Sequence, residues 1–156
     1  NVFPEPEGLL TKTPKLLGLD NRKMSKSYGN FILLSDSPAD IEKKTAAMIT
    51  DPSRIKLKDL GHPDICNVFS YYSIFADSGL LAEVKDWCQS AKLGCTECKS
   101  RLAKILTERL EPISKKRAKF SDDDVKDILK EGAGKARQAA GETMAAVRSL
   151  IHFAQE

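Results

Sequence analysis

Long apolar runs, internal repeats and low-complexity segments are all missing from this sequence. No stretch approaches the roughly 20 apolar residues of a membrane-spanning helix, so we expect no membrane span. The spacings G-x-x-x-x-G-K-S/T and G-x-G-x-x-G are also absent, which argues against two common glycine-rich phosphate-binding loops. Histidine is scarce, and we interpret His62 and His152 as structural or surface residues, because neither lies where a catalytic acid or base is expected.

The composition is typical of one globular domain. Hydrophobic residues make up 41% and charged residues 30% of the 156 residues, which indicates a folded chain with a well-solvated surface. The net charge of +3 permits an RNA partner but does not demand one. Basic residues cluster at Lys115, Lys116, Arg117 and Lys119. Such a cluster is typical of the C-terminal end of a helix, and it would also suit contacts to RNA phosphates.

The residue pattern predicts a mainly α-helical bundle that follows an irregular first segment. Residues 1–35 are interrupted by prolines and glycines and show no helical period; 31–34 are the best strand candidate. Ser37 followed by Pro38 predicts the start of a helix over 38–50, which Asp51-Pro52 should stop.

Beyond Gly61, apolar residues three or four apart predict four more helices. Pro112 should kink or end the third of these, and Ser121 should cap the last. In that last helix Gly132 and Gly134 indicate either a break or close packing against another helix. The apolar stripes consist of Val68, Tyr71, Tyr72 and Phe75; Leu80, Leu81, Val84, Trp87 and Cys88; Leu102, Ile105, Leu106, Leu110 and Ile113; and Val125, Ile128, Leu129, Ala136, Ala140, Met144, Val147 and Ile151.

A short basic loop between Asp20 and Asn30 carries the clearest functional signal. It contains the string K-M-S-K-S at residues 23–27, directly after Arg22, with glycines on both sides. A mobile loop with ammonium and hydroxyl groups suits a polyphosphate whose charge shifts during a reaction. Without further context, however, such a loop is more often a solvated turn.

The string K-M-S-K-S is identical to the signature loop of class I aminoacyl-tRNA synthetases, and the whole chain resembles the bacterial tryptophanyl-tRNA synthetases. The tyrosyl enzymes share the loop, but T-D-P at 50–52 and H-P-D-I-C at 62–66 favour the tryptophanyl family. The matching segments are V-F-P-E-P-E at 2–7, residues 11–19, L-S-D-S-P at 34–38, T-D-P-S-R at 50–54, G-H-P-D-I-C-N-V-F at 61–69, C-T-E-C-K at 95–99 and L-E-P-I at 110–113.

The resemblance implies the C-terminal part of a longer cytoplasmic enzyme of protein synthesis. Residues 1–35 would be the end of its nucleotide-binding domain, and residues 36–156 its helical anticodon-binding domain. The second class I signature, of the H-I-G-H type, is not in this sequence. We therefore expect the isolated chain to be inactive.

In the intact enzyme, tryptophan would react with ATP and Mg²⁺ to form tryptophanyl-adenylate, and the amino acid would then pass to tRNA(Trp). Lys23 and Lys26 would stabilise the leaving pyrophosphate, and Met24, Ser25 and Ser27 would complete the ATP-binding loop. Arg22 could assist, or it could be a surface charge. The family implies a homodimer whose contacts lie largely outside this chain. The alternative is a synthetase-like module that binds RNA without catalysis, which the coding sequence upstream of residue 1 would distinguish.

The four cysteines fall within one segment, in the order Cys66-x21-Cys88-x6-Cys95-x2-Cys98. A turn at Gly94 could bring Cys95 and Cys98 beside the helix end that bears Cys88, and four thiolates can hold zinc or an iron–sulfur cluster.

Some bacterial members of the resembled family carry a 4Fe–4S cluster on cysteines of nearly this spacing, with a slightly longer first gap. The resemblance thus implies a 4Fe–4S site. The alternatives are zinc, buried thiols without a metal, and a redox pair of Cys95 and Cys98. A cytosolic family disfavours disulfides.

Overall fold

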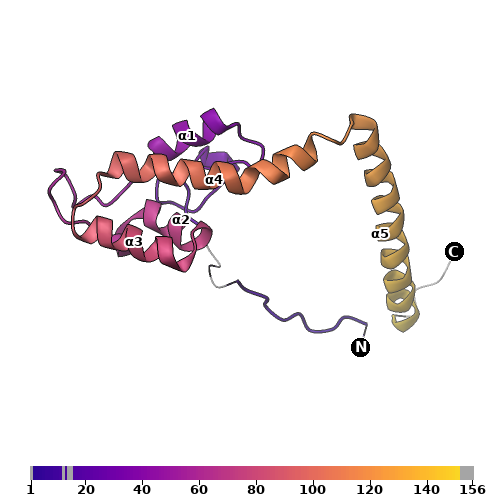
Figure 1. The fold of residues 1–156 in the computed structure, drawn as a ribbon. Helices are drawn as coiled ribbons and strands as arrows, with labels where there is room; N and C mark the ends of the chain where they lie inside the picture. The colour runs from indigo at the N-terminus through magenta and orange to yellow at the C-terminus, as the bar shows by residue number, and fades with distance from the viewer. Residues whose placement is uncertain (1, 12, 14–15, 152–156) are drawn as a thin grey trace. The chain divides into compact units, whose positions relative to one another are not determined.

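A computed structural model of the chain describes residues 2–11, 13 and 16–151 (Figure 1). In these residues the structure is mainly helical, as predicted, and contains no strand. The expected strand at 31–34 is wrong; an isolated antiparallel bridge joins Leu17 and Lys23 instead. The helices are α1 (Pro38–Ala46), α2 (Asn67–Phe75), α3 (Ser78–Gln89), α4 (Cys95–Arg117) and α5 (Asp122–Leu150), with short 3-10 helices η1 (Lys26–Tyr28) and η2 (Pro63–Ile65).

The chain divides into two compact units. Leu10–Lys115 form one unit, and Asn1–Leu9 with Lys116–Glu156 form the other. The first unit contains α1, α2, α3 and nearly all of α4, whereas α5 belongs to the second. None of the described helices has both the length and the apolar character needed to cross a membrane.

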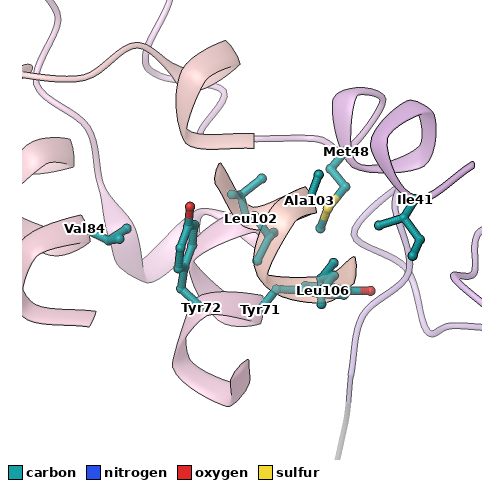
Figure 2. Close-up of a cluster of buried hydrophobic side chains, with 9 residues drawn as sticks. Ile41, Met48, Tyr71, Tyr72, Val84, Leu102, Ala103 and Leu106 are labelled. Carbon is teal, nitrogen blue, oxygen red and sulfur yellow. The ribbon is translucent and has the colours of Figure 1, made fainter. Parts of the chain in front are cut away.

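The core of the Leu10–Lys115 unit lies around α4. Figure 2 shows Leu102, Ala103 and Leu106 of α4 in the middle of the buried cluster. This confirms the predicted stripes of α2, α3 and α4 as the faces that pack together. The buried residues are Ile41, Met48, Val68, Tyr71, Tyr72, Val84, Leu102, Ala103 and Leu106.

Helix α1 starts where the sequence predicts but ends earlier. The Ser37 hydroxyl accepts a hydrogen bond from the Asp40 N–H at 3.1 Å, and the Asp40 carboxylate accepts from the Ser37 N–H at 3.3 Å. This reciprocal pair is a capping box. The helix stops at Ala46 rather than at residue 50, because the Ile49 N–H donates to the Leu19 carbonyl at 2.9 Å instead of continuing the helical ladder.

Helix α4 continues through Pro112 to Arg117, so the prediction that this proline could end the helix is wrong. Proline removes one backbone donor from the helical ladder. Pro112 lies in the exposed last part of the helix, near its C-terminal end, so the loss of its one backbone hydrogen bond does not disturb the buried part. The buried part of the helix, which contains Leu102 and Leu106, precedes it.

Helix α5 is continuous through Gly132 and Gly134, and a β-carbon at either position would have no described neighbour within 4 Å. Neither the predicted break nor the predicted close packing is found. The Ser121 capping box is present as expected. No described residue of α5 is buried; Ile128, for example, is 55% exposed. Within its own unit, the described residues therefore do not form the buried face that the apolar stripe predicts.

Candidate functional site

The K-M-S-K-S segment forms a compact turn. Its first lysine, Lys23, forms the backbone bridge with Leu17. Ser25 is extended, at φ −153° and ψ 140°, and its hydroxyl accepts a hydrogen bond from the Ser27 N–H at 3.2 Å. Gly29 closes the turn at φ 64°, a left-handed conformation that glycine adopts without steric cost.

The two lysines of the loop differ from the neighbouring arginine in their contacts. Lys23 and Lys26 are exposed, and their ammonium groups have no hydrogen-bond or ion-pair partner among the described residues. The Arg22 Nε donates to the Asp20 Oδ2 at 2.7 Å, and its guanidinium lies 4.5 Å from the centroid of the Tyr28 ring. The loop therefore offers two unpaired cations, whereas Arg22 is held in place.

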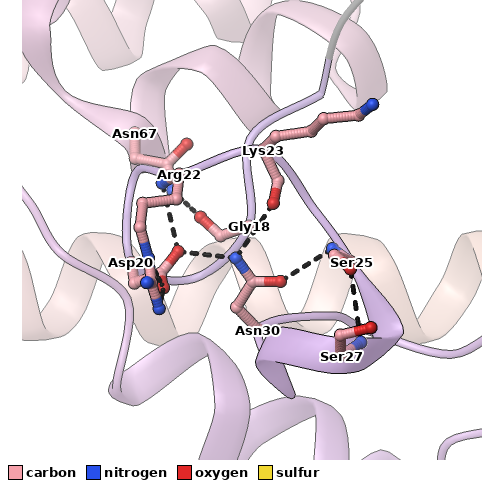
Figure 3. Close-up of polar contacts among 8 residues, drawn as sticks. All are labelled: Gly18, Asp20, Arg22, Lys23, Ser25, Ser27, Asn30 and Asn67. Carbon is pink, nitrogen blue, oxygen red and sulfur yellow. Dashed lines mark hydrogen bonds and ion pairs between the residues drawn. The ribbon is translucent and has the colours of Figure 1, made fainter.

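Asn30, which the sequence does not single out, lies at the centre of the loop. Its side chain is buried, with 4% of the residue exposed. Oδ1 accepts a hydrogen bond from the Ser25 N–H at 2.9 Å, and Nδ2 donates to Asp20 Oδ1 at 2.7 Å and to the Lys23 carbonyl at 3.2 Å. Figure 3 shows these bonds converging on the Asn30 amide, while the Lys23 ammonium points away from them.

Asp20 stays ionised at the base of the loop. The hydrogen bond from Asn30 lowers the pKa of Asp20 to about 2; the hydrogen bonds and positive charge of Arg22 contribute as well. At neutral pH this carboxylate is negatively charged, so it fixes the positions of the Asn30 amide and the Arg22 guanidinium.

The base of the loop is attached to α2. The Asn67 Nδ2 donates to the Gly18 carbonyl at 2.7 Å, and the Tyr71 hydroxyl donates to the Leu17 carbonyl at 2.7 Å. A β-carbon at Gly18 would lie 2.5 Å from the Asn30 carbonyl oxygen and closer still to the Asn30 amide. Only glycine fits at this position without displacing Asn30.

All four cysteines line one small cavity. Cys66 precedes α2, Cys88 lies in the last turn of α3, and Cys95 and Cys98 lie in the first turn of α4. The cavity has a volume of about 20 Å³, enough for one water molecule. The predicted return of the chain at Gly94, which brings Cys95 and Cys98 close to Cys88, is thus confirmed.

Two of the four thiols, Cys88 and Cys98, favour the neutral form. Burial raises the pKa of Cys98 to about 12, and burial also raises the pKa of Cys88. In the described part of the chain, no three histidine, cysteine or acidic side chains come close enough together to hold a single metal ion. A metal would therefore have to draw the thiols into a new arrangement and release their protons.

Arg54 lines the four-cysteine cavity, and the sequence does not predict this contact. Its Nη2 donates to the Leu93 carbonyl at 2.8 Å and to the Leu57 carbonyl at 3.1 Å, and its Nη1 lies 3.9 Å from Cys95 Sγ. Gly61 packs on the same side, and a β-carbon there would clash with Cys88 Sγ.

Of the remaining polar candidates, His62 and Lys115 are exposed and make local ion-pair contacts. His62 Nδ1 is 2.8 Å from Asp51 Oδ2. Burial opposes the charge of Asp51, but hydrogen bonds from His62 and Ser53 keep its pKa below the usual value. His152 lies outside the described residues. Lys115 at the end of α4 forms an ion pair with Glu111, Nζ to Oε1 2.8 Å.

Comparison with known proteins places this loop and these helices in a family. The family model described as "tRNA synthetases class I (W and Y)" matches residues 1–111. The chain belongs to this family of class I tRNA synthetases.

Within it, the similarity is to tryptophanyl-tRNA synthetases. The tryptophan–tRNA ligase of Aquifex aeolicus is 44% identical over 155 residues, covering 97% of this chain and 39% of the relative. The tryptophan–tRNA ligase of Thermotoga maritima is 42% identical over 158 residues, covering 97% of this chain and 47% of the relative. A crystal structure of tryptophanyl-tRNA synthetase from Campylobacter jejuni, complexed with ADP and tryptophan, matches with a TM-score of 0.77 at 26% identity, covering 97% of this chain and 48% of that one. The chain thus spans less than half the length of these relatives.

Proposed function

We propose that this chain is the C-terminal part of a tryptophan–tRNA ligase and supplies the loop that binds the phosphates of ATP. The observation that carries this proposal is a loop with two exposed lysines, Lys23 and Lys26, whose ammonium groups have no partner among the described residues, while Asn30 holds the backbone on both sides of Met24. The relatives of this chain that are named tryptophan–tRNA ligase support tryptophan as the amino acid that the enzyme activates. In the whole enzyme, tryptophan and ATP form tryptophanyl-adenylate, and tRNA(Trp) then receives the amino acid.

The lysines act on the charge that develops during adenylate formation. The tryptophan carboxylate attacks the α-phosphorus, and negative charge accumulates on the leaving pyrophosphate. Cations held at that place stabilise the transition state more than the ground state, and so accelerate the reaction. We assign this role to Lys23 and Lys26, with Mg²⁺ as the usual counter-ion of the ATP phosphates.

The other residues of the loop complete the phosphate site. The Ser25 hydroxyl already accepts the Ser27 N–H, so its own proton is available for donation to a phosphate oxygen. Ser27 offers a second hydroxyl. Met24 packs against the core, and we assign it the role of apolar anchor for the loop.

We divide the chain by function at residue 35. Residues 1–35 complete the nucleotide-binding domain, and residues 36–156 bind the anticodon part of tRNA(Trp). The basic residues Lys116, Arg117 and Lys119 suit contacts to tRNA phosphates, which bind without reading sequence. As a part of the translation machinery, the enzyme would act in the cytoplasm, and the family favours a homodimer.

The four-cysteine cavity is our candidate for a cofactor site. Its four thiols are donors of the kind that a thiolate-bound group takes, and binding would require them to move closer together than in the described structure. We propose a 4Fe–4S cluster held by Cys66, Cys88, Cys95 and Cys98; zinc, or no metal, is the alternative. Such a group would cross-link α2, α3 and α4 and thereby stabilise the helical part.

The function is tested by Lys26→Ala in the full-length enzyme, with Lys126→Ala as the control. Lys126 is exposed on α5 and pairs with Asp123. We expect Lys26→Ala to reduce tryptophan-dependent ATP–pyrophosphate exchange about 100-fold or more, with tryptophan affinity nearly unchanged. Equal exchange in the two variants would refute the role of Lys26. If the unsubstituted enzyme binds tRNA but shows no exchange, a non-catalytic RNA-binding module is the better description.

A further inference from the structure

One side-chain amide contacts the backbone on both sides of Met24 in the signature loop. The Ser25 N–H and the Lys23 carbonyl, which flank Met24, both hydrogen-bond to Asn30. The Asn30 backbone carbonyl also accepts from the Leu19 N–H at 2.9 Å. Asn30 therefore holds the loop from inside, within one residue of each lysine that would meet the phosphates.

The geometry requires an amide at this position. Oδ1 acts as an acceptor toward Ser25, while Nδ2 acts as a donor toward Asp20 and Lys23. A carboxylate of the same shape could not donate, and it would place a second negative charge beside the Asp20 carboxylate. An alanine would leave the loop groups without these partners.

Two residues hold Asn30 in this position. Gly18 leaves the space that the Asn30 amide occupies. Asn67, at the start of α2, fixes the Gly18 carbonyl at 2.7 Å. Asn67 directly follows Cys66, so the segment that supports the loop is continuous with the four-cysteine cavity.

We propose that Asn30 is a positioning residue for adenylate formation, which directs Lys23 and Lys26 toward the same polyphosphate by holding the peptide groups on either side of Met24. The proposal rests on the proposed function. The role of Asn30 goes beyond that function, because the orientation of the two lysines is assigned to a buried amide that does not itself touch ATP.

The test uses the full-length enzyme with Asn30→Ala and the isosteric Asn30→Asp. The control is Thr45→Val, which removes the buried hydrogen bond from Thr45 to the Ile41 carbonyl (2.6 Å) in α1. We expect both Asn30 variants to reduce kcat for ATP–pyrophosphate exchange about 100-fold, the scale of a misplaced catalytic group, with KM for tryptophan changed less than about threefold. Thr45→Val should retain kcat.

A double-mutant cycle separates positioning from general stability. If Asn30 acts through Lys23 and Lys26, Asn30→Ala should reduce kcat clearly less in a Lys26→Ala background than in the unsubstituted enzyme, because only Lys23 is then left to misplace. Multiplied losses in the double variant would mean that Asn30 does not act through Lys26, and the proposal would be overturned. Retention of kcat within about threefold in both Asn30 variants would overturn it as well.

Hydrogen exchange at the Ser25 amide gives a readout that does not depend on the reaction. Asn30→Ala should accelerate this exchange at least about tenfold, because the N–H loses its acceptor. Unchanged exchange would contradict the proposal even if the enzyme is active. If the unsubstituted enzyme shows no tryptophan-dependent ATP–pyrophosphate exchange, the proposed function is contradicted instead. Faster hydrogen exchange at the Ser25 amide in Asn30→Ala would then still establish that Asn30 holds the loop.

Discussion

Replacing Gly18 by alanine tests the packing at the base of the loop. The added β-carbon would lie 2.5 Å from the Asn30 carbonyl oxygen and nearer still to the Asn30 amide. Because backbone is among the atoms in contact, the clash cannot be relieved by a side-chain rotation alone. Asn30 has to move, and with it the groups to which it is bonded.

The expected cost follows from the hydrogen bonds that this movement breaks. Apart from its bond to the half-buried Asp20, Asn30 bonds to Ser25, Lys23 and Leu19. At about 1 kcal/mol net for each hydrogen bond, Gly18→Ala should lower the free energy of unfolding by about 3 kcal/mol. Overpacking alone would cost about 1–3 kcal/mol, which is of the same order.

Urea unfolding followed by tryptophan fluorescence measures this cost. Trp87, the one tryptophan of the chain, lies in α3, in the same compact unit as Gly18. Gly8→Ala is the control, since a β-carbon there has open space. The Gly18→Ala cost should shrink when Asn30 is already alanine. If Gly18→Ala is as stable as Gly8→Ala, the account of how Asn30 is held is wrong.

Three further predictions concern the cofactor, the pH dependence and α5. Protein purified without oxygen should be brown and contain about four irons per chain; colourless, iron-free protein would refute the 4Fe–4S proposal. Burial raises the pKa of Tyr71 to about 12, from the usual 10.0. Its neutral form therefore favours the fold below pH 10, and urea midpoints should fall as the pH rises from 10 to 12; Tyr71→Phe should reduce that fall. Gly132→Ala should stabilise α5 by up to about 1 kcal/mol in a thermal melt, since nothing described lies near the new methyl group; a lower melting temperature would mean that the helix packs closely at this position.

Local features of the fold are predictable from the sequence. The capping boxes at Ser37 and Ser121 depend on residues three positions apart, and both are found. The approach of Cys95 and Cys98 to Cys88 follows from the turn at Gly94 between α3 and α4. In each case, neighbours along the chain determine the contact.

Features that depend on distant contacts are not predictable in this way. Arg54 donates to the Leu93 carbonyl, 39 residues away, a contact that no local pattern predicts. Asn30 bonds within its own loop, but its role depends on the folded path of the loop, which brings the Lys23 carbonyl and the Ser25 N–H to one amide. The early end of α1 likewise depends on a bond from Ile49 to Leu19. The exposed stripe of α5 shows the opposite error, since an amphipathic pattern indicates a face suited to burial but not whether anything covers it.

The most direct test of the central claim is the amino-acid dependence of ATP–pyrophosphate exchange by the full-length enzyme. The family includes enzymes for tryptophan and for tyrosine, so both amino acids are compared at equal concentration. We predict exchange with tryptophan and at least about 100-fold less with tyrosine. Exchange that depends on tyrosine, or none with either amino acid, would contradict the assignment.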